Sequence, residues 1–199
     1  MEEIDLLYSH YNDTFSILKD KEKKRDRLFI ILFLLMMLLF LFSINQDSMY
    51  QMIKEFIKNK TDISLAFGFN VVLSFLWIIL FYSTIKYYQI VVHINRGYEY
   101  LHKLEATIDS KVDFKFERES KAYLDEYPIL LEFIYQMYIK VFPILYVVIV
   151  YYKIILEWQS TEYIFNNILN TIMATLIIIA TVFYFFALHP KLNKNLHNN

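Results

Sequence analysis

The chain has 199 residues, of which 57% are hydrophobic and 19% aromatic, with a net charge of −1, two glycines, three prolines and no cysteine. This composition excludes a disordered chain, and it argues against an all-β domain, which needs a turn about every ten residues. The lack of cysteine excludes disulfides, thiolate metal sites and cysteine nucleophiles. The predicted fold class is therefore all-α, and the long apolar runs predict a polytopic membrane protein with four transmembrane helices.

The N-terminal region combines an amphipathic stretch, a charged run and an apolar run. Residues 2–18 place apolar side chains at steps of three and four, which predicts a helix with one apolar stripe. This helix is expected to pack on its own protein, with a membrane surface or a partner protein as the alternative. Residues 19–27 are nearly all charged, so residues 1–27 form a predicted cytoplasmic region with a basic anchor. Residues 28–44 are apolar except for Ser43, and about 17 helical residues just cross a hydrocarbon core.

The two predicted spans within residues 28–83 flank a short amphipathic helix. Ser48 and Gln51 resemble a capping box, and the apolar residues that follow share one face of a helix at residues 48–59. We expect this helix to lie along the outer membrane surface or to cap an outer vestibule. Residues 63–83 are the second predicted span.

The helical pattern of the second span continues beyond the membrane. Apolar positions continue at alternating steps of three and four, which is the seam of a coiled coil. One rod is therefore predicted from residue 63 to about residue 108, as part of a cytoplasmic insert at residues 84–127, and the seam is predicted to set a homo-oligomer. The seam residues are Tyr87, Val91, Ile94, Tyr98, Leu101 and Ile108.

Residues 128–188 hold the third and fourth predicted spans, and a cytoplasmic tail follows at residues 189–199. Pro143 is expected to kink or loosen the third span, which ends near Glu157. Six Lys and Arg residues precede the first span and seven lie in residues 84–138, against three in the loop after the first span. The positive-inside rule therefore places both termini and the insert in the cytoplasm. Lys153 is expected to snorkel to the outer surface.

A set of polar residues lies at similar depth in the second and fourth spans. They predict either a polar pore lining, formed when several copies assemble, or interhelical hydrogen bonds that hold the bundle together. No acidic or basic residue is expected deep in a span, which argues against an ion-coupled transporter. The candidates are Asn70, Ser74, Asn167, Asn170, Thr171 and Thr175.

The cytoplasmic insert carries few signs of chemistry. Glu99 and His102 have the spacing of one di-metal half-site, but a second copy is lacking, so neither a metal nor another cofactor is predicted. Arg96 and His102 match the R-x4-6-H pattern and so resemble HEPN ribonucleases, in which the two residues meet across a dimer interface. A membrane-tethered ribonuclease is kept as a lesser alternative. Nine acidic against seven basic residues in 84–138 argue against direct nucleic-acid binding.

The four predicted spans, the segment Arg96-Gly-Tyr-Glu-Tyr-Leu-His102 and residues 118–128 resemble the small four-span membrane proteins encoded beside bacterial anti-phage machinery. These include the accessory membrane proteins of type VI CRISPR loci and the membrane component of the Kiwa system. The resemblance implies a homo-oligomer in the bacterial inner membrane, whose cytoplasmic part senses or docks a protein partner and whose spans perturb the membrane. The predicted function is a non-enzymatic, pore-forming effector or sensor, with a membrane scaffold that recruits a soluble enzyme as the alternative.

Overall fold

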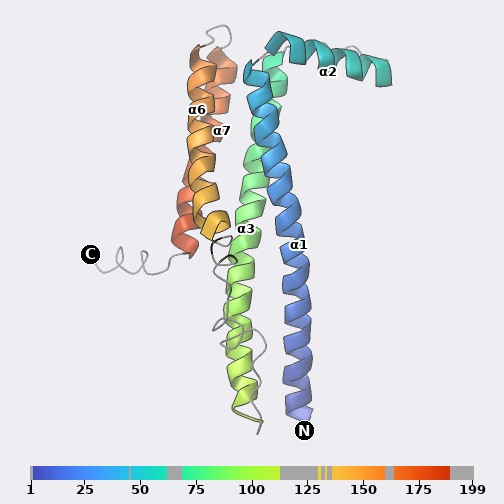
Figure 1. Cartoon of the computed structure of the whole chain (residues 1–199), viewed down its shortest axis with the longest axis vertical. Helices are drawn as coiled ribbons and strands as arrows, with labels where there is room; N and C mark the ends of the chain where they lie inside the picture. Colours follow the sequence, from blue (N-terminus) through green and yellow to red (C-terminus); the bar gives the residue numbers. More distant parts are fainter. Residues whose placement is uncertain are drawn as a thin grey trace, which may run out of the picture. The chain divides into compact units, whose positions relative to one another are not determined.

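The computed structural model describes residues 2–44, 46–61, 69–112, 130, 133, 136–159 and 164–188, and the regular structure of these residues is helical (Figure 1). The prediction of an all-α fold is confirmed. Residues 62–68, residues 113–129, which include the end of the predicted insert at residues 84–127, and the tail at residues 189–199 lie outside the described residues. The elements are α1 (Glu2–Ile44), α2 (Gln46–Thr61), α3 (Phe69–Asp109), a π-helix η1 (Met137–Val141), α6 (Phe142–Gln159) and α7 (Ile164–Leu188).

Among the described residues, three helices are long and apolar enough to cross a membrane. They cover Asn70–Asp109, Met137–Gln159 and Ile164–Leu188, and they correspond to the second, third and fourth predicted spans. The first predicted span forms the C-terminal part of α1, which continues without a break through the charged residues 19–27. A crossing of the membrane by α1 stays a prediction.

The chain divides into two compact units. The polar unit comprises Met1–Arg27, Tyr87–Pro143 and Phe186–Asn199, and the apolar unit comprises Leu28–Lys86 and Ile144–Phe185. Both α1 and α3 therefore contribute one part to each unit. In α1 the division falls where the charged run ends and the apolar run begins.

In the polar unit, α1 and α3 pack side by side along an apolar seam. Tyr11 and Leu18 of α1, one heptad apart, join a buried cluster with Leu101, Leu104 and Ile108 of α3. Low-numbered residues of α1 meet high-numbered residues of α3, so the two helices are antiparallel. The amphipathic stripe of the N-terminal helix thus packs on its own chain.

Gly97 lets the two helices of the polar unit approach closely. A Cβ atom at this position would overlap the Cδ2 atom of Leu18. Glycine inside a helix costs about 0.5–1 kcal/mol relative to alanine. The close contact with Leu18 is the structural reason for this residue in the middle of α3.

The apolar unit is built from inward stripes that repeat at steps of three and four. Each stripe occupies one face of its helix, which is the spacing of knobs-into-holes packing. The stripes are Leu32, Met36, Leu39 and Phe42 of α1; Leu73, Trp77, Leu80 and Thr84 of α3; Tyr146, Val150, Lys153 and Glu157 of α6; and Asn167, Asn170, Ala174, Ile177 and Thr181 of α7.

Pro143 follows a widened helical turn. The five residues Met137–Val141 form a π-helix, and the backbone N–H of Phe142 donates to the carbonyl of Met137. Proline lacks an N–H and its ring crowds the carbonyl four residues earlier, so a wider turn accommodates it. The expected loosening takes this form. At α2, by contrast, the predicted cap at Ser48 is wrong, because the helix already begins at Gln46.

We predict that the volume at position 97 controls the packing of α1 on α3. Gly97→Ala should change the free energy of unfolding by less than about 1 kcal/mol. The higher helix propensity of alanine should compensate for the cost of moving the Leu18 methyl group. Gly97→Leu should be less stable than Gly97→Ala by about 1–3 kcal/mol through overpacking. Ala106→Leu, at an exposed site of the same helix, is the control and should unfold like the wild type. Thermal unfolding in detergent by circular dichroism measures this, and equal stability of the Gly97→Leu and Gly97→Ala variants would contradict the packing account.

Candidate functional site

One carboxylate ties three helices of the apolar unit together. Glu157 of α6 is 3% exposed, and its Oε1 accepts from Trp77 Nε1 of α3 and from Lys153 Nζ, both at 3.0 Å. Its Oε2 accepts from Asn170 Nδ2 of α7 at 2.8 Å. Hydrogen bonds to an ionised group are roughly twice as strong as neutral ones. A single buried charge therefore holds α3, α6 and α7.

Lys153 supplies the compensating charge from one helical turn before Glu157. It is 2% exposed, so the prediction that it snorkels to the surface is wrong. The reason is that its carboxylate partner lies on the same inward face of α6. Both members of this pair belong to the candidate span Met137–Gln159, close to its C-terminal end, and the prediction that no acidic or basic residue lies deep in a span stays a prediction.

Further side-chain bonds join the end of α6 to the start of α7. Asn167 Nδ2 donates to the backbone carbonyl of Glu157 at 3.2 Å, in the last turn of α6, where carbonyls have no partner within the helix. Trp158 Nε1 donates to Thr171 Oγ1 at 2.9 Å. These bonds fix the register of the two helices and so aim Asn170 at the carboxylate.

The polar residues predicted to line a pore or to bind the helices fall into two groups. Ser74, Asn167 and Asn170 are buried within the single chain, whereas Asn70 and Thr171 are half-buried and Thr175 is exposed. Ser74 Oγ accepts from Asn166 Nδ2 at 3.1 Å. The Thr171 and Thr175 hydroxyls donate to carbonyls one turn earlier on α7. These bonds are interhelical or local, and a pore lining stays a prediction.

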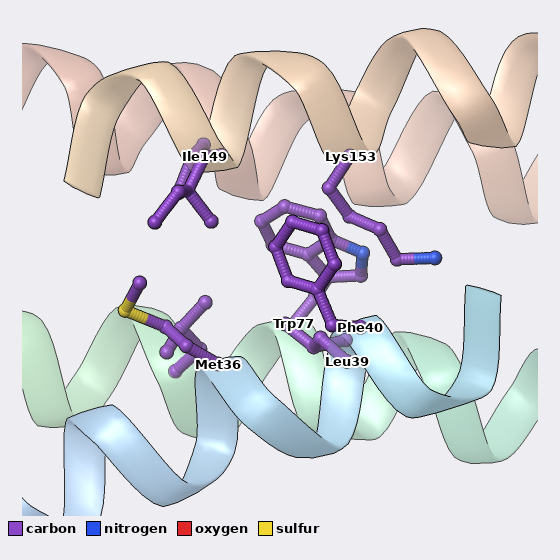
Figure 2. Close-up of a pocket in the computed structure, with 8 residues that line it drawn as sticks. Met36, Leu39, Phe40, Trp77, Ile149 and Lys153 are labelled. Carbon is purple, nitrogen blue, oxygen red and sulfur yellow. The ribbon is translucent and has the colours of Figure 1, made fainter. Parts of the chain in front are cut away.

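The space beside the ion pair is too small for a ligand. Figure 2 shows Lys153 extending from α6 beside the rings of Trp77 and Phe40. The cavity measures about 10 Å³, which is about the size of one water molecule. Its lining is otherwise apolar, with Met36 and Leu39 from α1 and Ile149 from α6.

The polar unit has a second buried carboxylate and a group of hydrogen bonds around Lys19. Glu105 Oε1, on α3, accepts from the hydroxyl of Tyr11 at 2.7 Å, and both residues are buried. Nearby, Lys19 Nζ donates to Tyr98 and to Glu22, both at 3.2 Å. Burial lowers the pKa of Lys19, but the hydrogen bonds to Tyr98 and Glu22 outweigh it, so this pKa is raised above its ordinary value.

The predicted oligomer seam is largely buried within one chain. Leu101 and Ile108 pack in the cluster that contains Tyr11 and Leu18 of α1. Their burial needs no second copy, and the homo-oligomer stays a prediction. Of the remaining seam residues, three are buried, namely Tyr87, Val91 and Ile94, and Tyr98 is half-buried.

The candidates for nuclease or metal chemistry are not brought together. Arg96 is exposed and His102 half-buried on one helix, six residues and therefore about 120° apart. In the part of the chain that the structure describes, no group of three or more His, Asp or Glu residues is placed to hold a metal.

Sequence reasoning missed the buried pair Lys153–Glu157, although a signal was present. Lys153 and Glu157 continue the step of Tyr146 and Val150 along one face of the third span. A stripe that begins with apolar residues and continues into an i,i+4 pair of opposite charge indicates a pair that points into the bundle. Their place near the end of the span favoured the snorkelling interpretation instead.

No protein-family model matches the chain, and neither a curated protein nor a solved structure matches it significantly. Function must therefore be argued from the chain's own sites.

We predict that the ion pair stabilises the apolar unit only as a pair. Glu157→Gln leaves a buried ammonium without a counter-charge, and Lys153→Met leaves a buried carboxylate, so each should cost about 3–5 kcal/mol of unfolding free energy. The double variant removes both charges, and the introduced amide can donate to Asn170 Oδ1, which no described residue bonds. Most of the loss should then be recovered.

A thermodynamic cycle over the wild type, the two single variants and the double variant measures this coupling. A double variant whose loss equals the sum of the single losses would contradict the pairing.

Proposed function

We propose that the chain is a non-enzymatic, homo-oligomeric effector or sensor of a bacterial anti-phage defence system, crossing the inner membrane four times. The polar unit lies in the cytoplasm and controls the packing of the apolar unit. The observation that carries this proposal is the buried Lys153–Glu157 pair. Ionisable residues inside membrane helices are costly and generally mark functional sites.

The two faces of α1 support a fourth span. Leu32 and Met36 face the interior of the apolar unit, while the opposite side of the same stretch is apolar and exposed. Such a face suits contact with lipid tails, and in water it would be an unusually large apolar patch. The exposed residues are Ile30, Ile31, Phe33, Leu34, Met37 and Leu41.

The bonding of the inward polar groups supports a closed resting state. Glu157 accepts from Trp77, Lys153 and Asn170, and Asn166 donates to Ser74, so these groups already have partners within the chain. A polar passage would require these partners to separate. We therefore propose that a cytoplasmic event, transmitted along α3, weakens the ion pair and opens the bundle within an assembly of several copies.

A membrane scaffold is the second candidate, and one observation favours it. Leu6 and Ile17 of α1 are 71% and 56% exposed, although they belong to the polar unit. Eleven residues apart, they lie about 20° from each other on the helix. His10 and Asp13 lie between them on the same side of the helix, so a protein partner would meet two exposed apolar side chains with polar residues between them.

Ion flux into liposomes separates these functions. Purified wild type should leave vesicles tight, Glu157→Gln should make them leak, and the double variant Lys153→Met with Glu157→Gln should restore the barrier. The reason is that an unpaired buried ammonium favours any state in which it reaches water.

The control for unfolding is Leu80→Ala, which removes a buried side chain of the same unit at a similar cost of about 2–5 kcal/mol. This variant should stay tight. Equal leakage of Leu80→Ala and Glu157→Gln would contradict the effector proposal, and tight vesicles for every variant would favour the scaffold.

The defence role is tested by plaque counts on cells that carry the gene with its neighbouring genes, and equal counts with and without the gene would contradict it.

A further inference from the structure

Helix α2, which belongs to the apolar unit, exposes large apolar side chains. Met52 and Phe56, one turn apart, are 64% and 65% exposed, whereas Ile53 and Ile57 are half-buried. On a helical wheel these four residues cover an apolar sector of about 140°. The exposed pair forms one side of this sector and the half-buried pair the other.

The place of α2 in the chain says what covers this face. It follows the apolar part of α1 after one residue and precedes α3, whose segment from Asn70 is apolar enough to cross a membrane. Figure 1 shows α2 turning away from the direction of the two helices that it connects. A helix in this position starts where apolar spans end, which is the boundary between lipid tails and headgroups.

The charges of α2 fit the same boundary. Lys54 and Lys58 lie on the side opposite Met52 and Phe56, while Lys60, in the last turn, lies at an angle between Phe56 and Ile57 and reaches the headgroups from the end of the helix. Long lysine side chains can reach phosphates while the apolar sector lies among acyl chains. Three lysines against Asp47 and Glu55 give the helix a net positive charge.

We propose that α2 is a lipid-binding helix that lies in the membrane surface, with Met52 and Phe56 inserted between acyl chains and its lysines on anionic headgroups. This inference requires only that the apolar unit sits in a membrane, and it is independent of the effector function. It extends the chain's contact with lipid from the spans to one leaflet surface.

The absence of cysteine from the chain allows a direct test. Phe56→Cys and Glu55→Cys are each labelled with bimane in proteoliposomes that contain a nitroxide-labelled phosphatidylcholine. Glu55 is also exposed, but it lies about 100° from Phe56 on the helix. We expect quenching at position 56 to exceed quenching at position 55 by at least about twofold, because only the first label reaches the acyl chains.

Two further measurements show which part of the proposal fails, if one does. Phe33→Cys, on the exposed apolar face of α1, reports whether the apolar unit is in the bilayer. Strong quenching at position 33 with equal, weak quenching at positions 55 and 56 would overturn the α2 proposal and leave the spans intact. Anionic phosphatidylglycerol should raise quenching at position 56 over phosphatidylcholine alone, and Lys58→Gln with Lys60→Gln should remove that increase. An unchanged increase would overturn the headgroup contact.

Discussion

The apolar unit depends on one carboxylate that is buried away from water and shared by donors from three helices. Burying an ion costs several kcal/mol even after relaxation, so Glu157 needs every donor that surrounds it. Trp77 and Asn170 come from α3 and α7, so their bonds to Glu157 restrict how these helices slide or rotate against α6, while Lys153 of α6 itself supplies the counter-charge. Apolar stripes alone allow neighbouring registers of similar energy, because packing is nearly non-directional. The carboxylate makes one register specific, in the way a buried polar residue fixes a coiled coil.

The polar unit holds its two helices, α1 and α3, together by other contacts than an ion pair. Its α1–α3 seam combines apolar packing with the Tyr11–Glu105 and Lys19–Tyr98 hydrogen bonds, and Gly97 lets the two helices approach closely. The seam along α3 continues into the apolar unit, where the buried residues Trp77, Leu80 and Thr84 keep the same step of three and four. One helix thus uses a continuous stripe for both units. In the proposed function, a change of register at one part of α3 would shift the rest of this helix, and this is how a cytoplasmic event would be transmitted.

Periodicity predicted the helices well and their partners less well. The continuous helix of α3 and the stripe at residues 2–18 follow from steps of three and four, which depend only on local geometry. Whether a seam faces a second copy or another part of the same chain depends on contacts between residues about 90 positions apart, as at Tyr11 and Glu105. Periodicity contains no such information. The same limit explains the error at Lys153, which bonds Glu157, a carboxylate that also accepts from Trp77 and Asn170 on other helices.

The most direct test of this account is the charge-swapped chain that carries Lys153→Glu together with Glu157→Lys. The swap keeps both charges, their spacing and the net charge, but it places an ammonium where Trp77 and Asn170 direct N–H groups. If the carboxylate is the common acceptor for three helices, the swapped chain should unfold well below the wild type in thermal scans. A swapped chain as stable as the wild type would contradict that claim, because the stability would then not depend on which of the two positions holds the carboxylate.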